Sequence, residues 1–226
     1  PLQIVAGDLH GLNTLQHQPA KVAAMEGHFE TQAGAPLILF GWPDMDEERT
    51  RYAVAVPKLG SLILTHDLDG TVRGLKEWPP EDRPPAAIVF WSFRVMVAAG
   101  FAMVSIGLWS LWLRRQARLF DTPAFLRTVA LLGPAGIVAV LAGWITTEVG
   151  RQPFTVYGLL RTSESVSAVA APAVASSLLA FVVVYCAVFG AGAYYMLRLM
   201  RQPPHPSEPG LPPGDYRVLP TREFRE

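Results

Sequence analysis

The sequence predicts an all-α integral membrane protein, a transmembrane helix bundle that carries an extracytoplasmic polar loop. Half of the 226 residues are hydrophobic and 17% are charged, and the mean hydropathy is +0.26. These values are typical of a membrane protein with sizeable polar segments. Three apolar segments are also long enough to cross the hydrocarbon core, which takes roughly 20 residues.

The composition argues against several other classes of protein. The net charge is zero, so nothing indicates nucleic acid as a partner. The single cysteine, Cys186, lies inside an apolar run, cannot pair within the chain and belongs to no CxxC metal motif. No signal peptide precedes the opening "PLQIVAGDLHG", which begins at Pro1 and resembles the middle of a longer protein. We therefore expect a fragment.

The three predicted spans cover residues 86–113, 125–148 and 171–199. The second contains Gly133-Pro134, which predicts a kink that neighbouring helices in a bundle can tolerate. The third is rich in small residues, which suit close packing between helices.

Four other segments complete the predicted organisation. Residues 1–25 would be the end of a truncated membrane segment. Residues 26–85 form a polar insert, in which "RYAVAVPKLGSLILTH" alternates in the manner of short strands. Residues 149–170 form a loop, and the proline-rich residues 200–226 predict a disordered tail.

The basic residues predict the orientation of the spans. Arginines occur in "RRQAR" between the first two spans, and Arg198 and Arg201 close the third. Positive residues favour the cytoplasmic side, so the first connection and the tail would lie inside. The polar insert and residues 149–170 would then share the outer face.

Two side chains within the first span are candidates for function. An arginine at the centre of a span costs roughly 2.5–3.5 kcal/mol on insertion scales, so the presence of Arg94 within a span requires an explanation. It could simply extend its charged end to the interface, and Met96 could be ordinary packing.

The second span ends in "WITTEVGRQPF". On a helix continued by one turn, Trp144, Glu148 and Arg151 lie at i, i+4 and i+7 on one face, while Gly150 permits a helix end and Pro153 prevents continuation. The pair could merely mark the end of a helix. It could also serve haem, whose iron takes an axial ligand and whose propionates attract arginine.

The stretch "QHQPAKVAAMEGHFETQ" contains Lys21 and Glu26, five residues apart. On a helix they would be offset by about 140 degrees, so they are not a simple pair and could be solvated charges. The spacing of His10, His17 and His28 matches no zinc pattern.

Three strings, "QPAKVAAMEGHFE", "FWSFRVMVAAG" and "GWITTEVGRQPF", resemble subunit I of the cytochrome bd quinol oxidases, in this order. The chain looks like the C-terminal half of that subunit, and the resemblance covers all but the tail. It implies that the polar insert is the family's Q-loop, in a short form that resembles the subgroup including cyanide-insensitive members. It also implies haems b558, b595 and d, a second subunit and a bacterial inner membrane.

The resemblance also implies roles for individual residues. Lys21 and Glu26 match the lysine and glutamate of the quinol-site motif. Met96 matches the ligand of the haem b558 iron, and Arg94 matches the arginine beside it. Glu148 matches the acidic ligand of haem b595; Trp144 and Arg151 match neighbours of haems b595 and d.

The implied reaction is reduction of dioxygen to water with electrons from quinol. Two departures matter. Phe154 stands where the family commonly has tryptophan, so an indole N–H is lost. The family's histidine ligands belong to the other half of the subunit, and none of the five histidines here inherits that role. A haem-free module that binds quinone or a partner subunit, and a transporter piece with Arg94 and Glu148 on a polar path, are the alternatives.

Overall fold

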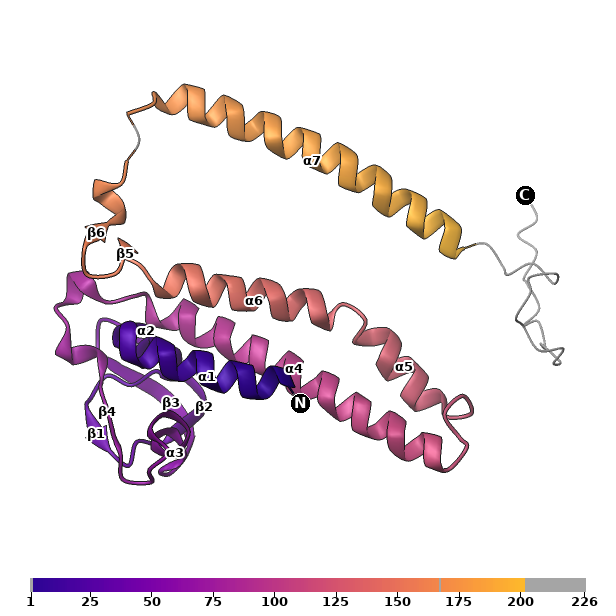
Figure 1. Ribbon diagram of the computed structural model, residues 1–226, viewed down its shortest axis with the longest axis horizontal. Helices are drawn as coiled ribbons and strands as arrows, with labels where there is room; N and C mark the ends of the chain where they lie inside the picture. The colour runs from indigo at the N-terminus through magenta and orange to yellow at the C-terminus, as the bar shows by residue number, and fades with distance from the viewer. Residues whose placement is uncertain (1, 167, 202–226) are drawn as a thin grey trace, which may run out of the picture. The chain divides into compact units, whose positions relative to one another are not determined.

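The computed structural model describes residues 2–166 and 168–201 (Figure 1). Two compact units, residues 1–166 and 167–226, are described separately. The first holds helices α1 to α6, strands β1 to β6 and three short 3-10 helices, η1 to η3. The second holds helix α7 (Ala171–Met200). The predicted disordered tail falls almost entirely on residues outside those described.

Three helical segments are long and apolar enough to cross a membrane, as predicted. Among the described residues, they are Pro80–Arg115, Pro123–Gly150 and Ala171–Met200. The first consists mainly of α4 (Ala86–Arg115). The strands of the described residues form three two-stranded sheets, all in the connections between helices. The mostly helical fold class is therefore confirmed.

The second span is interrupted at the predicted position. Helix α5 (Pro123–Leu131) ends before Gly133, and α6 (Ala135–Gly150) begins after Pro134. Proline has no N–H to donate to the preceding turn, so the Gly-Pro step separates two helices instead of bending one.

Helices α4 and α6 lie side by side over much of their length (Figure 1). The hydroxyl oxygens of Ser92 and Thr146 are 2.9 Å apart across this contact. A Cβ atom added to Gly143 would lie 2.8 Å from the sulfur of Met96. Small residues on α6 therefore let the two helices approach closely.

The polar insert contains four strands, which form two antiparallel pairs. Strand β2 (Leu37–Asp44) pairs antiparallel with β3 (Arg49–Val56), and β1 (Gln32–Ala33) pairs with β4 (Thr71–Val72). The helical turns η1 (Leu75–Glu77) and η2 (Pro80–Asp82) lead into α4.

The strand prediction for residues 51–66 is right for its first half and wrong for its second. After Pro57 the chain forms α3 (Leu59–Thr65). Proline cannot donate to a strand ladder, which ends the hairpin. The Ser61 hydroxyl then accepts from Ala35 N at 2.6 Å and donates to the Gly70 carbonyl at 2.7 Å, which fixes α3 on the insert.

A small apolar core connects the insert to the helices. It comprises Ala23, Ala24, Phe29, Leu75, Ala86 and Val89. Helix α1 (Leu2–His17) precedes α2 (Pro19–Glu26), which ends at Gly27. Gly27 has a φ of +71°, a conformation that favours glycine. Its carbonyl accepts a 2.6 Å hydrogen bond from Thr50 of β3, which ties α2 to the hairpin.

The loop predicted at residues 149–170 begins after Gly150, since Val149 and Gly150 still belong to α6. It contains β5 (Phe154–Val156), β6 (Leu160–Arg161) and η3 (Thr162–Glu164). Arg161 pairs with Asp82 at 2.5 Å, which holds this loop against the residues that lead into α4.

Candidate functional site

Helix α2 places Lys21 and Glu26 in the interior of the first unit. Pro19 lies in its first turn, where a missing N–H is tolerated. Lys21 is 7% exposed and Glu26 is 6% exposed. The alternative that these are solvated charges at the start of a loop is therefore wrong.

Arg94 of α4 connects this helix to the insert. Its guanidinium nitrogen Nη2 lies 3.0 Å from Glu26 Oε2. The same group donates to the carbonyl of Ile38 on β2, from Nη2 at 2.5 Å and from Nε at 3.1 Å. Nη1 donates to the Met25 carbonyl. All of these partners lie within the protein, so Arg94 makes specific contacts at its position on α4.

Burial and neighbouring charge act on the two α2 side chains. Burial raises the pKa of Glu26, and Arg94 opposes that rise. Burial also lowers the pKa of Lys21, with a further lowering by Arg151 and an opposing contribution from Glu148. Glu26 therefore binds a proton more readily than an ordinary glutamate.

A cavity of about 450 Å³, here called the inner cavity, lies beside both residues. Lys21 and Glu26 of α2, Phe93 and Met96 of α4 and Gly143 of α6 all contribute to its lining.

Further polar side chains line this cavity. The sequence interpretation missed Asp8 and Thr14 of α1 and Thr146 and Thr147 of α6, and it considered His10 only as a possible metal ligand.

The remaining predicted site residues lie at the C-terminal end of α6. Glu148 and Arg151 form an ion pair, with side chains 39% and 41% exposed. Trp144 is 63% exposed and does not line the inner cavity. Gly143, Thr146 and Thr147 of the same helix do line the cavity, and Lys21 of α2 reaches both the cavity and the C-terminal end of α6.

The link explains why residue 150 is glycine. A Cβ atom at Gly150 would lie 2.9 Å from Lys21 Cγ. Gly150 is the last helical residue, and it is not among the described residues with positive φ. The helix ends at Gly150, as expected, but not through a left-handed conformation of this residue. Its small size makes room for Lys21.

Phe154 follows this helix end at the position where tryptophan was expected. Its ring packs edge-on against Tyr157, with centroids 5.5 Å apart. The guanidinium carbon of Arg161 lies 5.6 Å from the Phe154 centroid. Phe154 thus makes aromatic contacts at this position, although its ring has no N–H donor.

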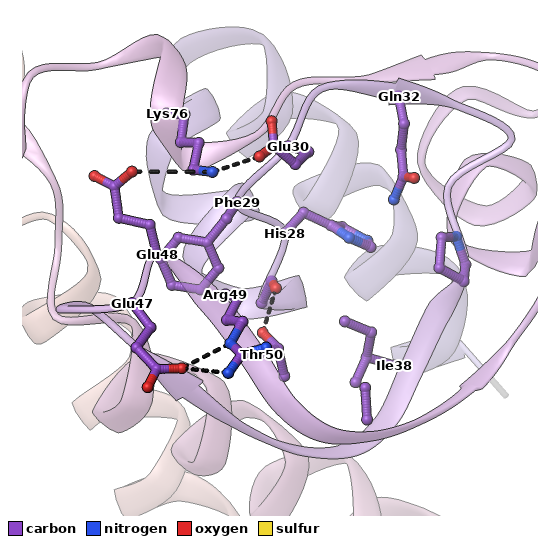
Figure 2. A pocket seen from close by; sticks show the side chains of 13 residues that line it. His28, Phe29, Glu30, Gln32, Ile38, Glu47, Glu48, Arg49, Thr50 and Lys76 are labelled. Atoms are coloured by element: carbon purple, nitrogen blue, oxygen red, sulfur yellow. Dashed lines mark hydrogen bonds and ion pairs between the residues drawn. The ribbon is translucent and has the colours of Figure 1, made fainter.

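A second cavity of about 420 Å³, here called the outer cavity, lies within the insert. Figure 2 shows the His28 side chain directed toward Gln32, with the Lys76–Glu30 ion pair at another side of the cavity. His28 is 3% exposed and its Nε2 atom has no hydrogen-bond partner. Burial, with Arg94 contributing, lowers its pKa to about 4, so the imidazole is neutral at pH 7.

The residues present fit the binding of haem. Met96 offers a thioether at the inner cavity, and methionine is an established axial ligand of haem iron. Among the described residues, Lys21 has no ion-pair partner within 4.0 Å, and Arg151 Nε is buried without a hydrogen-bond acceptor. Such cations suit propionate groups.

Comparison with known proteins points to one family. The profile of the family described as "Cytochrome bd terminal oxidase subunit I" matches residues 1–204. The chain is 35% identical over 192 residues to "Cytochrome bd ubiquinol oxidase subunit 1" of Bacillus subtilis (strain 168), covering 80% of this chain and 41% of that protein. A second protein of that organism, "Putative cytochrome bd menaquinol oxidase subunit I", is 32% identical over 183 residues, with 80% and 40% covered.

Solved structures give the same result. The chain matches "The structure of bd oxidase from Geobacillus thermodenitrificans" with a TM-score of 0.71 and 33% identity, covering 89% of this chain and 46% of that one. The chain therefore spans less than half the length of these relatives. It belongs to the cytochrome bd terminal oxidase subunit I family, whose members carry haem.

Proposed function

We propose that this chain is part of the haem-bearing subunit of a terminal respiratory oxidase that oxidises quinol and reduces dioxygen to water. Oxidation of one quinol gives a quinone, two electrons and two protons. Two quinols therefore supply the four electrons that reduce one dioxygen, with four protons, to two waters. When bound, haem supplies the electron transfer and the oxygen chemistry.

The inner cavity is the proposed place of quinol oxidation. Glu26 faces it with a raised pKa, so its carboxylate accepts a proton from a quinol hydroxyl. Arg94 is a positioning residue, because its bond to Glu26 Oε2 and its bonds to two backbone carbonyls fix the carboxylate. Lys21 contributes positive charge to the same cavity.

The residues of α4 and α6 take the proposed haem-binding roles. Met96 is the ligand of the haem b558 iron, and Glu148 is the ligand of the haem b595 iron. Arg151 and Trp144 border haems b595 and d, with the arginine placed to pair with propionates.

One observation carries this proposal. The carboxylate of Glu26 and the thioether of Met96 line one cavity, and Arg94 lies two residues before Met96 on the same helix. The proposed proton acceptor and the proposed redox-centre ligand thus contribute to the lining of the same cavity. Quinol oxidation requires both, since it releases protons and electrons together.

The family relationship supports the rest of the assembly. The partners would be an oxidase subunit II and the lipid bilayer of a bacterial plasma membrane. The insert and residues 149–170 would face outward, as the distribution of basic residues favours.

Glu148 provides a direct test in the full-length oxidase. Glu148→Gln keeps size but loses the anion, and we expect weakened b595 and d absorption together with reduced oxygen consumption. Arg151→Lys keeps the charge but loses the planar fork, so it should do milder damage. Pyridine haemochrome analysis and an oxygen electrode measure both. Wild-type haem content and turnover in Glu148→Gln would refute the ligand role.

A further inference from the structure

The β2–β3 hairpin of the insert exposes an apolar face that the composition of the insert does not predict. Phe40 and Val54 are direct partners across the ladder, and Val56 lies two residues beyond Val54 on the same side. Leu39, Trp42 and Tyr52 lie next to irregular points of the ladder, and the exposed fractions of all six range from 39% to 82%. None of them is charged. Contiguous exposed apolar surface usually marks an interaction site.

The charged side chains of the hairpin gather at its tip instead. Arg51 pairs with Asp44 at 2.9 Å, and Arg49 pairs with Glu47 at 2.6 Å. Phe40 and Val54 face each other further along the ladder. Trp42 pairs across the ladder with Arg51, so it marks the border between the polar tip and the apolar part of the hairpin.

The hairpin lies beside the first turns of a membrane-spanning helix. The Ile38 carbonyl accepts hydrogen bonds from Arg94, and the rings of Phe40 and Trp91 meet edge-on at 5.1 Å between centroids. Strand β2 is thus fixed at the level of residues 91–94 of α4.

This level can be placed relative to the hydrocarbon core. Helix α4 has 30 residues, which at 1.5 Å each make about 45 Å, longer than a core of about 30 Å. Arg114 and Arg115 mark one end of its apolar part. Arg94 lies about 30 Å from Arg114 along the helix axis. The hairpin, which Arg94 contacts, is therefore level with the boundary between hydrocarbon and headgroups.

We propose that the apolar face of the β2–β3 hairpin is immersed in the lipid headgroup–acyl boundary beside α4. The two aromatic side chains with a polar group, Trp42 and Tyr52, are the types enriched at such boundaries. The apolar middle of the hairpin meets lipid, while its paired charges at the tip remain in water. The polar insert is consequently a membrane-contacting element as well as a loop.

The continuity of this face with the surface of α4, and its depth in the membrane, favour lipid over a protein partner. The face continues the surface of α4, where Ile88 and Val95 are also exposed, at 53% and 41%. A surface at this depth, beside a spanning helix, meets lipid unless another protein segment covers it. The N-terminal half of the subunit and the second subunit are the competing occupants, and the experiment separates them from lipid.

Site-directed spin labelling of the complete oxidase in lipid nanodiscs tests the proposal. Nitroxides would be placed at Val54→Cys and, independently, at Leu39→Cys, with Cys186 replaced by alanine throughout. Asp46→Cys at the hairpin tip is the aqueous control, and Val183→Cys on α7, which is 59% exposed, is a control in a spanning segment. Without an electron donor, collision rates with oxygen and with a water-soluble nickel complex are measured.

The expected result is an oxygen-to-nickel collision ratio at positions 54 and 39 that is several-fold above that at position 46. Nickel access equal to that at position 46 would place the face in water. Low access to both reagents would mean that another protein segment covers it. Either of these two results would overturn the proposal.

Discussion

Arg94 Nη2 lies 3.0 Å from Glu26 Oε2, although 68 residues separate the two in the chain. Their side chains are 13% and 8% exposed. A partly buried pair of this kind holds two helices and a strand in register. Removing one partner leaves a buried charge alone, which is more damaging than removing both.

The pair can be tested with a double-mutant cycle. Arg94→Gln and Glu26→Gln should each lower the thermal stability of the oxidase, and the double variant should lose less than the sum. We expect a coupling of about 1 kcal/mol or more, as is usual for residues in one buried network.

The exposed pair Lys58–Asp69 is the matched control, since it lies in the same insert. The corresponding glutamine and asparagine variants should show no measurable coupling. Strict additivity at Arg94 and Glu26 would mean that the pair does not organise the site.

Met96 gives a spectroscopic prediction. Met96→Leu changes side-chain volume little but removes the sulfur, so the low-spin b558 band should disappear from the reduced-minus-oxidised spectrum while the protein still assembles. Met103→Leu, on the same helix and 42% exposed, should leave the band intact. An unchanged band in Met96→Leu would exclude Met96 as ligand.

Gly150 tests the contact between α2 and α6. Gly150→Ala adds a Cβ 2.9 Å from Lys21 Cγ, and overpacking of this kind typically costs about 1–3 kcal/mol. The variant should therefore lose quinol oxidase activity faster on heating.

The control is Gly136→Ala on the same helix, where an added Cβ meets nothing within 4 Å. It should be neutral or stabilising, because alanine favours helices over glycine by about 1 kcal/mol. Equal heat inactivation of the two variants would show that the contact with Lys21 does not explain the glycine at position 150.

His28 predicts a pH dependence of stability. Its pKa falls from 6.5 to about 4 in the folded protein, which corresponds to about 3 kcal/mol at roughly 1.4 kcal/mol per unit. The unfolded state binds the proton more readily, so this stability is present above pH 6.5 and is lost as the pH falls toward 4.

His28→Asn keeps a donor near the position of Nδ1 but does not titrate. Heat inactivation between pH 6.5 and 4.5 should depend less on pH in this variant than in the wild type. His66→Asn, at an exposed position, should keep the wild-type profile. A wild-type profile in His28→Asn would show that protonation of His28 does not destabilise the fold.

The sequence predicted the spans well because each is a long and mostly apolar run, and the Gly133-Pro134 break has a local chemical cause. The segment after Pro57 was not predictable in this way. "LGSLILT" is a short apolar stretch that suits a strand or a helix equally, and tertiary bonds from Ser61 select the helix.

The site residues were identified from motifs, but their contacts were not. No sequence pattern connects Arg94 to Glu26 or to the Ile38 carbonyl, since these are long-range contacts made by the packing of α2, α4 and β2. The sequence predicted that the helix can end at Gly150, which it does, but not the contact that requires a small residue there. Here the packing partner Lys21 comes from a distant segment.

The most direct test of the central claim, that Glu26 accepts a proton from quinol beside the Met96 ligand, is to compare donors in Glu26→Gln. Glutamine keeps the size of the side chain but cannot take the proton. We expect oxygen consumption driven by a soluble quinol to fall at least about tenfold. Consumption driven by ascorbate and tetramethyl-p-phenylenediamine, which bypasses quinol, should stay near the wild-type rate with an unchanged haem spectrum. Full quinol-driven turnover, or an equal loss with both donors, would contradict the account.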